Sequence, residues 1–289
     1  MTENIVAVVT GASRGVGRGI AIALGRQGAT VYVAGRTSVS GTQTTPGGVP
    51  VPGSIFETAS EVTKAGGKGI AVVCDMADDR QIEVLFEQVR REEGRLNILV
   101  NNAAYLSESM FVKPFWTSKI DPATIFDVGL RCHHVATYFA APLLVESGHG
   151  LVVNVSFFSN AKIHDPSFYA SKAGLDTLAN IYADEFRPFG VFAVSLWPGF
   201  TATERLRAAA DVDKGVQQLE AAFGFESLEY SGRIINALYG DPDLPSLSGK
   251  TLISAELGER YGIVDADGKV PGSLRAHFGG PPPAFDSQA

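Results

Sequence analysis

Several features that would assign a chain to a special class are scarce in this sequence. Only two cysteines occur among 289 residues. Cys74 and Cys132 lie in apolar segments without the spacing of metal ligands, so neither a disulfide scaffold nor a metal site is predicted. We expect both to be buried packing thiols in a reducing cytoplasm.

Long apolar runs and excess positive charge are also missing. The longest apolar stretches fall well short of the ~20 residues that a membrane-spanning helix needs. The amino terminus shows no charged lead and apolar segment of a signal peptide, since it runs almost directly into "IVAVVTGAS". A net charge of −7 offers no basic field for nucleic acid and no basic helix for a membrane surface. We therefore expect a cytoplasmic protein with neither partner.

Short β-rich runs alternate with longer helical stretches along most of the chain. Such alternation is typical of βαβ units, and continuous apolar runs are typical of parallel strands buried on both faces. The pattern predicts an α/β, doubly wound fold with a mainly parallel seven-stranded sheet and helices on both faces. The predicted strands are Ile5–Thr10, Thr30–Ala34, Lys68–Cys74, Ile98–Asn101, Gly150–Val155, Val191–Leu196 and Thr251–Ala255, and helices are expected at Ile55–Ala65, Asp79–Glu92, Pro122–Val145 and after Tyr169.

We expect one domain over residues 1–278. A Pro/Gly/Thr-rich stretch at 37–53 reads as an inserted loop. Residues 201–225 are predicted to be helical. The tail 279–289, with three consecutive prolines, is expected to be flexible.

A glycine-rich turn follows the first predicted strand and opens a helix. It comprises Thr10, Gly11, Ala12, Ser13, Arg14, Gly15, Val16 and Gly17. Glycines here permit a tight turn and let the backbone approach a pyrophosphate at the helix N-terminus. Because the turn begins a βαβ unit, it predicts a nucleotide site in a Rossmann fold.

The spacing of this turn, TGxxxGxG, resembles that of the short-chain dehydrogenase/reductase family. Asn102 lies in an Asn-Asn-Ala sequence where the family has NNAG, although Ala104 replaces the glycine. The resemblance implies that Pro198, Gly199 and Thr203 bind the cofactor, with Thr203 holding the nicotinamide carboxamide, and that Asp75 contacts the adenine. It covers about residues 5 to 270 and places a substrate lid at 201–225. "KPFWTS" and "VSLWPGF" are similar to the dehydrogenase/reductase member-one subgroup.

Basic residues decide the expected cofactor. The second strand is followed by Arg36, with no carboxylate to accept from an adenosine ribose hydroxyl. Arg14 and Arg36 lie where the family carries residues that select a 2′-phosphate, which suits guanidinium groups. We therefore predict NADP(H).

The family resemblance also assigns catalytic roles. It implies that Ser156 binds the substrate oxygen, that a tyrosine donates the proton, and that Lys172 holds the nicotinamide ribose and favours the phenolate. The family's tyrosine lies four residues before the lysine, but that position holds Phe168, and Tyr169 follows it. The family's relay asparagine is replaced by Gly129.

Two helical registers remain open for the acid. In the first, Tyr169 donates the proton. Tyr169 lies three residues before Lys172 instead of four, so its ring is turned by about 100° around the helix axis from the family's tyrosine position. In the second, the preceding loop is shorter and Phe168 takes the tyrosine's place. Asp165 and Pro166 are predicted to cap the helix, which puts both rings in its first turn. We list Tyr169 with Ser156 and Lys172 as the candidate catalytic set.

Two other groups of residues have less specific interpretations. Adjacent His133 and His134 lack ligand spacing, so packing is favoured over a metal site. The aromatic residues Phe115, Trp116 and Trp197 could line an apolar substrate pocket or pack in the core. Family members are commonly dimers or tetramers, which implies a homodimer or homotetramer here.

Two functions fit these residues. The first is an NADP(H)-dependent oxidoreductase that reduces an apolar ketone or aldehyde to an alcohol, or runs the reverse reaction. The second keeps the NADP(H)-binding fold with altered or lost redox chemistry, as in an isomerase, a cyclase or a cofactor-sensing protein. The departures at Gly129 and Phe168 support the second.

Overall fold

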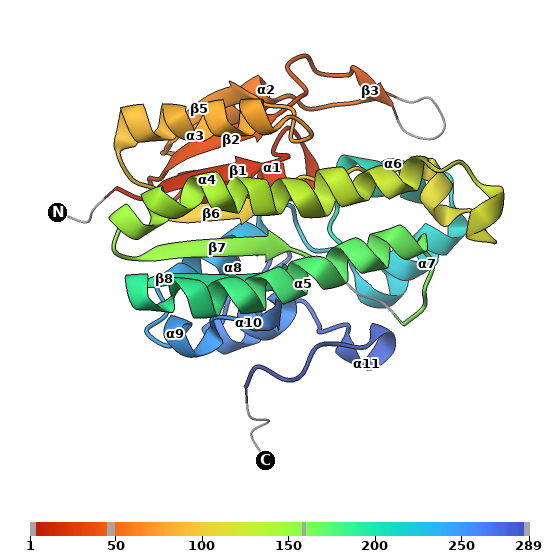
Figure 1. The fold of residues 1–289 in the computed structure, drawn as a ribbon. Coiled ribbons are helices and arrows are strands. Elements are labelled where there is room, and N and C mark those ends of the chain that lie inside the picture. The colour runs from red at the N-terminus through yellow and green to blue at the C-terminus, as the bar shows by residue number, and fades with distance from the viewer. Residues whose placement is uncertain (1–3, 45–49, 158–159, 286–289) are drawn as a thin grey trace.

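Seven parallel strands form the central sheet of the computed structural model, which describes residues 4–44, 50–157 and 160–285. The strand order is β5-β2-β1-β6-β7-β8-β9, so the chain winds outward in both directions from β1 (Figure 1). The strands are β1 (Val6–Thr10), β2 (Thr30–Gly35), β5 (Lys68–Val73), β6 (Ile98–Asn101), β7 (Gly150–Val155), β8 (Val191–Trp197) and β9 (Thr251–Ile253). The predicted doubly wound Rossmann sheet is confirmed.

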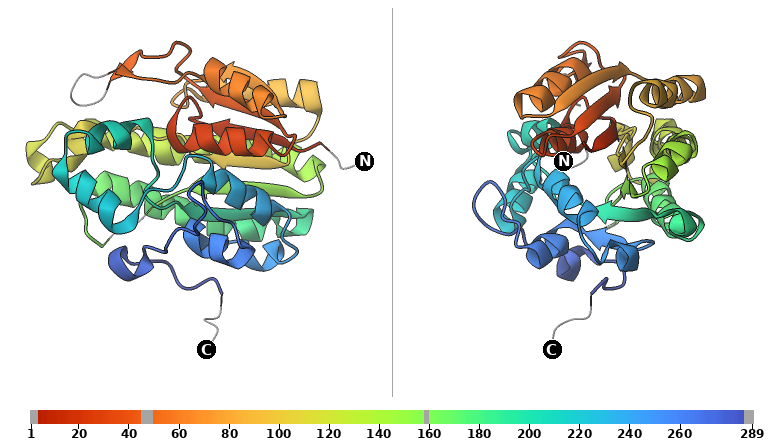
Figure 2. Two further views of the ribbon diagram at one scale, coloured as in Figure 1. Left: turned by 180° about the vertical axis from the view of Figure 1, so that it is seen from behind. Right: turned by 90° about the vertical axis from the view of Figure 1, so that its left-hand side faces the viewer.

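The strands form where the sequence is continuously apolar because both faces of the sheet are covered. Helices α1 (Gly15–Gly25), α2 (Ile55–Lys64) and α8 (Tyr230–Tyr239) cover one face, and α3 (Asp79–Glu93), α4 (Cys132–Glu146) and α5 (Pro166–Phe186) the other (Figure 2). Each face has its own core. Ile20 and Ile234 belong to the first, and Leu85 and Leu143 to the second. Burial of these side chains stabilises the three-layer arrangement.

The predicted helix Pro122–Val145 is wrong in its first third. Residues Asp121–Phe126 form a 3₁₀ helix, and a distorted turn over Asp127–Arg131 precedes α4. Gly129 has φ +152°, a conformation that side chains rarely adopt, so a regular helix cannot pass through it. The last predicted strand is also shorter than expected, since Ser254 already begins α10.

The remaining elements are short. The inserted segment contains an antiparallel pair, β3 (Gln43–Thr44) and β4 (Pro50–Val51), while 45–49 lie outside the described residues. The segment expected to be a lid forms two helices, α6 (Glu204–Ala210) and α7 (Lys214–Phe223). The others are η1 (Glu108–Phe111), η2 (Phe115–Thr117), η5 (Arg187–Phe189), α9 (Leu244–Leu247), α10 (Ser254–Tyr261) and α11 (Arg275–Phe278).

Part of the tail that we expected to be flexible makes contacts. Lys250 Nζ donates to the Ala284 carbonyl at 3.0 Å, and the Arg260 guanidinium lies 4.6 Å from the Phe285 ring centre. Residues 286–289 of that tail lie outside the described part of the chain. Among the helices that are described, none is both long and apolar enough to cross a membrane.

Candidate active site

The glycine-rich turn and the end of β6 are packed against each other at the carboxyl edge of the sheet. Gly11 has φ +64°, and a Cβ on it would lie 2.7 Å from the Ala103 Cα. A Cβ on Gly17 would lie 2.4 Å from the Asn102 Nδ2, which donates to the Thr10 carbonyl at 2.9 Å. Gly11 is therefore required by contact as well as by conformation, and Gly17 by contact.

The remaining predicted residues of this turn lie at the start of α1. Ser13 is buried, Val16 is half-buried against the first core, and Gly15 has φ +58°. The Gly15 amide donates to a carboxylate oxygen of Glu204 at 2.9 Å, and Arg18 donates to the other at 3.2 Å. Glu204 thus joins the predicted lid to the glycine turn. Sequence reasoning missed it because no local pattern links residues this far apart.

The two arginines predicted to select the cofactor have different surroundings. Arg14 donates to the backbone carbonyls of Pro52 and Gly53, at 3.2 and 2.9 Å, and is thereby fixed to the inserted segment. Burial, followed by the nearby charge of Arg205, lowers the pKa of Arg14. Arg36 is exposed and lies 3.8 Å from a carboxylate oxygen of Asp75. One guanidinium is held by the fold and the other is largely solvated.

Ser156 and Lys172 are brought together between β7 and α5. The Ser156 hydroxyl donates to the Lys172 carbonyl at 3.0 Å, and Lys172 Nζ donates to the Val155 carbonyl at 2.9 Å. Both side chains are buried. Burial lowers the pKa of Lys172 to about 8, although the charge of Asp176 opposes this shift. A buried amine of this kind can change its proton occupancy near neutral pH.

Asp176 is a second residue that the sequence analysis missed. It lies one helical turn after Lys172 and accepts hydrogen bonds from Ser195 Oγ and, at 3.2 Å, from Trp197 Nε1. Burial raises its pKa, and the hydroxyls of Ser195 and Ser156 act in the opposite direction. The four-residue spacing from Lys172 is the signal that could have identified it.

The Phe168 ring lies next to the lysine. Its centre is 5.9 Å from Lys172 Nζ, and the His164 imidazole stacks on it with ring centres 4.3 Å apart. Tyr169 is half-buried, and its hydroxyl lies 3.3 Å from His164 Nδ1. Asp165 caps the helix by accepting from the Ser167 amide at 2.8 Å, which confirms the predicted helix start.

Gly129 contributes backbone rather than a side chain. A Cβ there would lie 2.8 Å from Ile125 Cγ1, and its carbonyl accepts from Ser171 Oγ at 3.1 Å. Nearby His133 is fully buried and its Nε2 lies 2.8 Å from the Ala103 carbonyl. Burial lowers the pKa of His133 to about 3, so the ring is neutral and donates from Nε2.

The turn after β8 carries the remaining predicted cofactor residues. Pro198 and Gly199 follow Trp197 directly, and Thr203 caps α6 by accepting from the Leu206 amide at 3.2 Å. The Thr203 Cγ2 lies 3.4 Å from the position of a Cβ on Gly15. Thr203 therefore lies against the glycine turn, and Figure 1 shows α6 and α7 beyond the carboxyl ends of the strands.

The three aromatic side chains noted in the sequence have different positions. Trp116 is 73% exposed and Phe115 is 48% exposed, and both line a surface pocket of about 630 Å³ with Ile120 and Phe126. Trp197 is buried against Ile253 in a small core cluster. Core packing therefore applies to Trp197 alone.

The two cysteines and the adjacent His133 and His134 act as packing groups. Cys74 and Cys132 are free and buried, and burial raises the pKa of each thiol to about 12. His134 Nδ1 lies 2.7 Å from the Tyr182 hydroxyl. Within residues 4–44, 50–157 and 160–285, no group of three or more histidine, cysteine or acidic side chains could hold a metal ion.

Comparisons with known proteins find similar sequences over most of this chain. A family model described as enoyl-(acyl carrier protein) reductase matches residues 49–227. The chain is 40% identical over 279 residues to human "Dehydrogenase/reductase SDR family member 1", covering 91% of this chain and 84% of that protein.

Two solved structures share the fold. A putative dehydrogenase from Xanthomonas campestris superposes with a TM-score of 0.75 at 24% identity, covering 93% of this chain and 97% of the other. A short chain dehydrogenase from Mycobacterium thermoresistibile gives 0.76 at 21% identity, with coverage of 93% and 92%.

Proposed function

The chain belongs to the short-chain dehydrogenase/reductase family, and from this premise we propose that it is an NADP(H)-dependent oxidoreductase. In this proposal it reduces the carbonyl of an apolar ketone or aldehyde, or oxidises the corresponding alcohol. The observation that carries the proposal is the pairing of buried Ser156 with buried Lys172 at the edge of the sheet where the glycine turn also ends.

The described residues suit an extended dinucleotide. The glycine turn places backbone amides at the start of α1, where the Gly15 amide donates to Glu204, and Thr203, which follows Pro198 and Gly199 in the chain, lies beside Gly15. In the proposal these groups hold the pyrophosphate and the nicotinamide, with Asn102 and Lys172 supporting the nicotinamide ribose. Arg14 and Arg36 would pair with a 2′-phosphate, and Asp75 would contact the adenine.

The chemistry assigned to the chain is orientation and proton transfer. When bound, the nicotinamide supplies or accepts the hydride. Ser156 would donate a hydrogen bond to the substrate oxygen, and the positive charge of Lys172 would stabilise the negative charge that develops there. Tyr169 remains our candidate for the proton donor, with His164 as the hydrogen-bond partner of its hydroxyl.

One observation favours a second function. Phe168, which cannot donate a proton, lies beside Lys172 where the family has tyrosine. An NADP(H)-binding protein with lost or altered redox chemistry, such as an isomerase, a cyclase or a cofactor sensor, would keep the fold and the cofactor residues while tolerating this ring.

Following NADPH absorbance with a panel of apolar carbonyls separates the two functions. We expect the chain to consume NADPH and Tyr169→Phe to lose that activity. A large gain in Phe168→Tyr over an inactive parent would instead assign the chain to the second function. If no variant consumes NADPH although all bind it, the reductase proposal is wrong for those carbonyls.

The remaining proposals concern assembly and compartment. We propose a cytoplasmic homodimer or homotetramer that acts on a small molecule, with no nucleic-acid or membrane partner. The net charge of −7 supports the first of these exclusions. Sedimentation velocity of the purified chain tests the assembly.

A further inference from the structure

Glu226 connects the segment after α7 to the turn that carries Gly199. Its backbone amide donates to the Phe200 carbonyl at 2.7 Å, and its carbonyl accepts from the Ala202 amide at 2.8 Å. The segment therefore runs beside the turn after β8 and is hydrogen-bonded to it in two places. The position of Glu226 is fixed by backbone contacts, independently of its side chain.

The Glu226 side chain is enclosed beneath this turn. The residue is 5% exposed, and Oε1 accepts from Ser254 Oγ at 2.8 Å. Its other oxygen, Oε2, is buried and has no hydrogen-bond partner among the residues that the structure describes. A Cβ on Gly199 would lie 2.7 Å from Oε1, so a side chain at position 199 would require the carboxyl to shift. A buried carboxylate with one unpartnered oxygen is costly to keep ionised.

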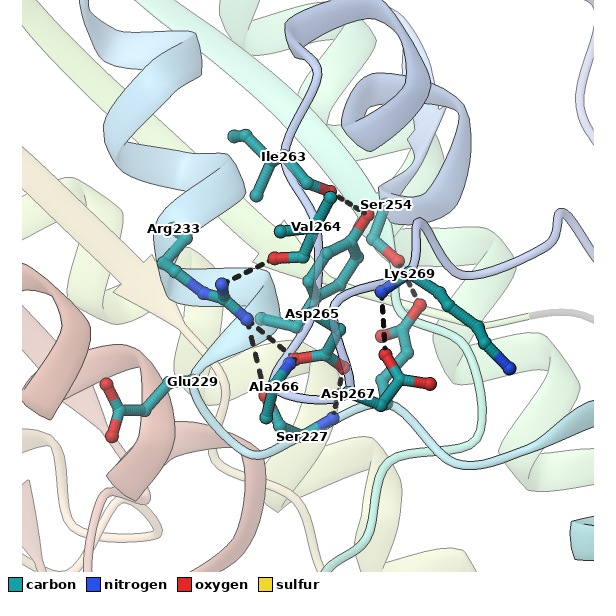
Figure 3. A network of polar contacts seen from close by, with 12 residues as sticks. Ser227, Glu229, Arg233, Ser254, Ile263, Val264, Asp265, Ala266, Asp267 and Lys269 are labelled. Atoms are coloured by element: carbon teal, nitrogen blue, oxygen red, sulfur yellow. Dashed lines mark hydrogen bonds and ion pairs between the residues drawn. The ribbon is translucent and has the colours of Figure 1, made fainter.

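The charges around Glu226 come from three segments. Asp265 accepts from Arg233 Nη2 at 2.6 Å and from the amide and hydroxyl of Ser227, as Figure 3 shows. Asp267 and Lys269 line a pocket of about 300 Å³ with Glu226. The charge of Glu226 also acts on Tyr230, whose pKa is raised to about 12 by burial first and then by Glu226.

These surroundings leave Glu226 between two protonation states. Burial, reinforced by the negative charge of Asp265, raises the pKa of Glu226 to about 7. The Ser254 hydroxyl and the Gly199 amide act in the opposite direction because they hydrogen-bond the carboxylate. A charge that changes near neutral pH therefore lies directly against the turn assigned to the nicotinamide.

We propose that Glu226 determines which oxidation state of the cofactor this chain prefers, because its ionised carboxylate attracts the positively charged nicotinamide of NADP⁺ and not the neutral ring of NADPH. This inference rests on the proposed cofactor site. The interaction acts through the Gly199 turn in a buried region, where Coulomb attraction is stronger than in water. Binding of NADP⁺ then favours loss of the Glu226 proton, and NADPH does not.

The dissociation constants of NADP⁺ and NADPH, measured by calorimetry from pH 5.5 to 8.5, test the inference. Their ratio cancels effects common to both cofactors, including titration of the 2′-phosphate. From pH 6 to 8 we expect the ratio of the NADP⁺ to the NADPH constant to fall by about threefold to tenfold in the parent chain. Glu226→Gln, which keeps the shape and removes the charge, should lose most of this fall.

Asp267→Asn is the matched control, because Asp267 lines the same pocket but is exposed. Among the described residues, its carboxylate accepts a hydrogen bond only from the Lys269 amide, at 3.0 Å. This variant should keep the parent's pH dependence. If Glu226→Gln does not fold, Ser254→Ala serves instead. Loss of the hydroxyl that stabilises the carboxylate should move the fall in the ratio to higher pH.

The inference is overturned if the ratio of the two dissociation constants does not change with pH in the parent chain. It is also overturned if this ratio changes with pH as much in Glu226→Gln as in the parent. Failure of the proposed cofactor site has a different signature, whereas loss of redox activity alone leaves the ratio of the two dissociation constants measurable. If the cofactor site fails, neither cofactor binds to any variant at any pH, and the inference falls with the site on which it rests.

Discussion

The two ends of the candidate cofactor site are built in different ways. At the glycine turn, backbone packs on backbone, and contacts at Gly11 and Gly17 leave no room for a single added carbon. At the nicotinamide end, the ionisable side chains of buried Lys172 and Glu226 and of half-buried Asp176 determine the environment. The first end is specified by shape, and the second by charges whose state changes with pH. Substitutions should therefore act differently on the two.

The largest effect is expected at the turn specified by shape. Gly11→Ala adds a carbon 2.7 Å from the Ala103 Cα at φ +64°. We expect it to lower the free energy of unfolding by about 3 kcal/mol or more, because backbone must move to relieve the contact. Urea unfolding measures this loss, and NADPH binding should be lost with it.

Gly28→Ala is the matched control, since Gly28 also has positive φ (+82°) but a Cβ there would have nothing within 4 Å among the described residues. It carries the conformational cost alone, about 1 kcal/mol. Equal losses in the two variants would show that the contact with Ala103 does not matter and would break the comparison.

The same contrast explains which features could be predicted from the sequence. The strands of the sheet could be predicted, because burial on both faces leaves a continuous apolar run such as Ile98–Asn101. The glycine turn has a fixed local spacing. The break in the helix predicted from Pro122 could not be foreseen, because nothing in the sequence shows that Gly129 adopts φ +152°.

Two of the three missed site residues, Glu204 and Glu226, could not be identified for the same physical reason. Glu204 and Glu226 act through contacts with residues far away in the sequence, Gly15 and Ser254 respectively. Their importance depends on burial, which a single acidic letter does not reveal. Asp176 is the exception, because its spacing from Lys172 was visible.

The end specified by charge should respond to Asp176→Asn. The Asp176 charge supports the protonated form of Lys172, whose pKa burial has already lowered to about 8. Without that charge the pKa of Lys172 falls further, and less of the amine is protonated at pH 7. We expect kcat to drop on the order of tenfold, with the alkaline limb of the rate profile moved to lower pH, because that limb follows the loss of the Lys172 proton.

Asp184→Asn controls for a general effect on this helix. Asp184 lies on α5 as well, but its ion pair with Arg187 is exposed, and such pairs contribute little. The variant should match the parent in kcat and in pH profile. Loss of activity in Asp176→Asn without any movement of the profile would assign Asp176 a packing role only.

Stability should also depend on pH at this end. Glu226 has its pKa raised from 4.5 to about 7, so the folded chain retains a proton that the unfolded chain loses. The stability contributed by this proton is present below pH 4.5 and is lost as the pH rises to about 7. Glu226→Gln changes the free energy of unfolding relative to the parent. We expect this change to be more favourable at pH 8 than at pH 4.5 by about 2 kcal/mol.

Lys172 contributes in the opposite direction. Its pKa is lowered from 10.5 to about 8, so the buried ammonium destabilises the fold below pH 8. This destabilisation decreases as the pH rises from 8 to 10.5. Denaturant midpoints for Lys172→Met and Glu226→Gln across this range separate the two residues. If the denaturant midpoints of both variants and the parent depend on pH in the same way, these two charges do not control stability at the nicotinamide end.

The smallest effect is expected at the adenosine end, where Arg36 is 56% exposed and lies 3.8 Å from Asp75. Solvent screens such a charge, so Arg36→Ala should weaken NADPH binding by only about threefold to tenfold and leave NADH binding nearly unchanged. Arg14, which is anchored by the carbonyls of Pro52 and Gly53, should matter more when replaced by alanine. Calorimetric titration with both cofactors measures the preference. If Arg36→Ala weakens NADH and NADPH equally, Arg36 does not read the 2′-phosphate, and Arg14 alone carries the selection of NADP(H).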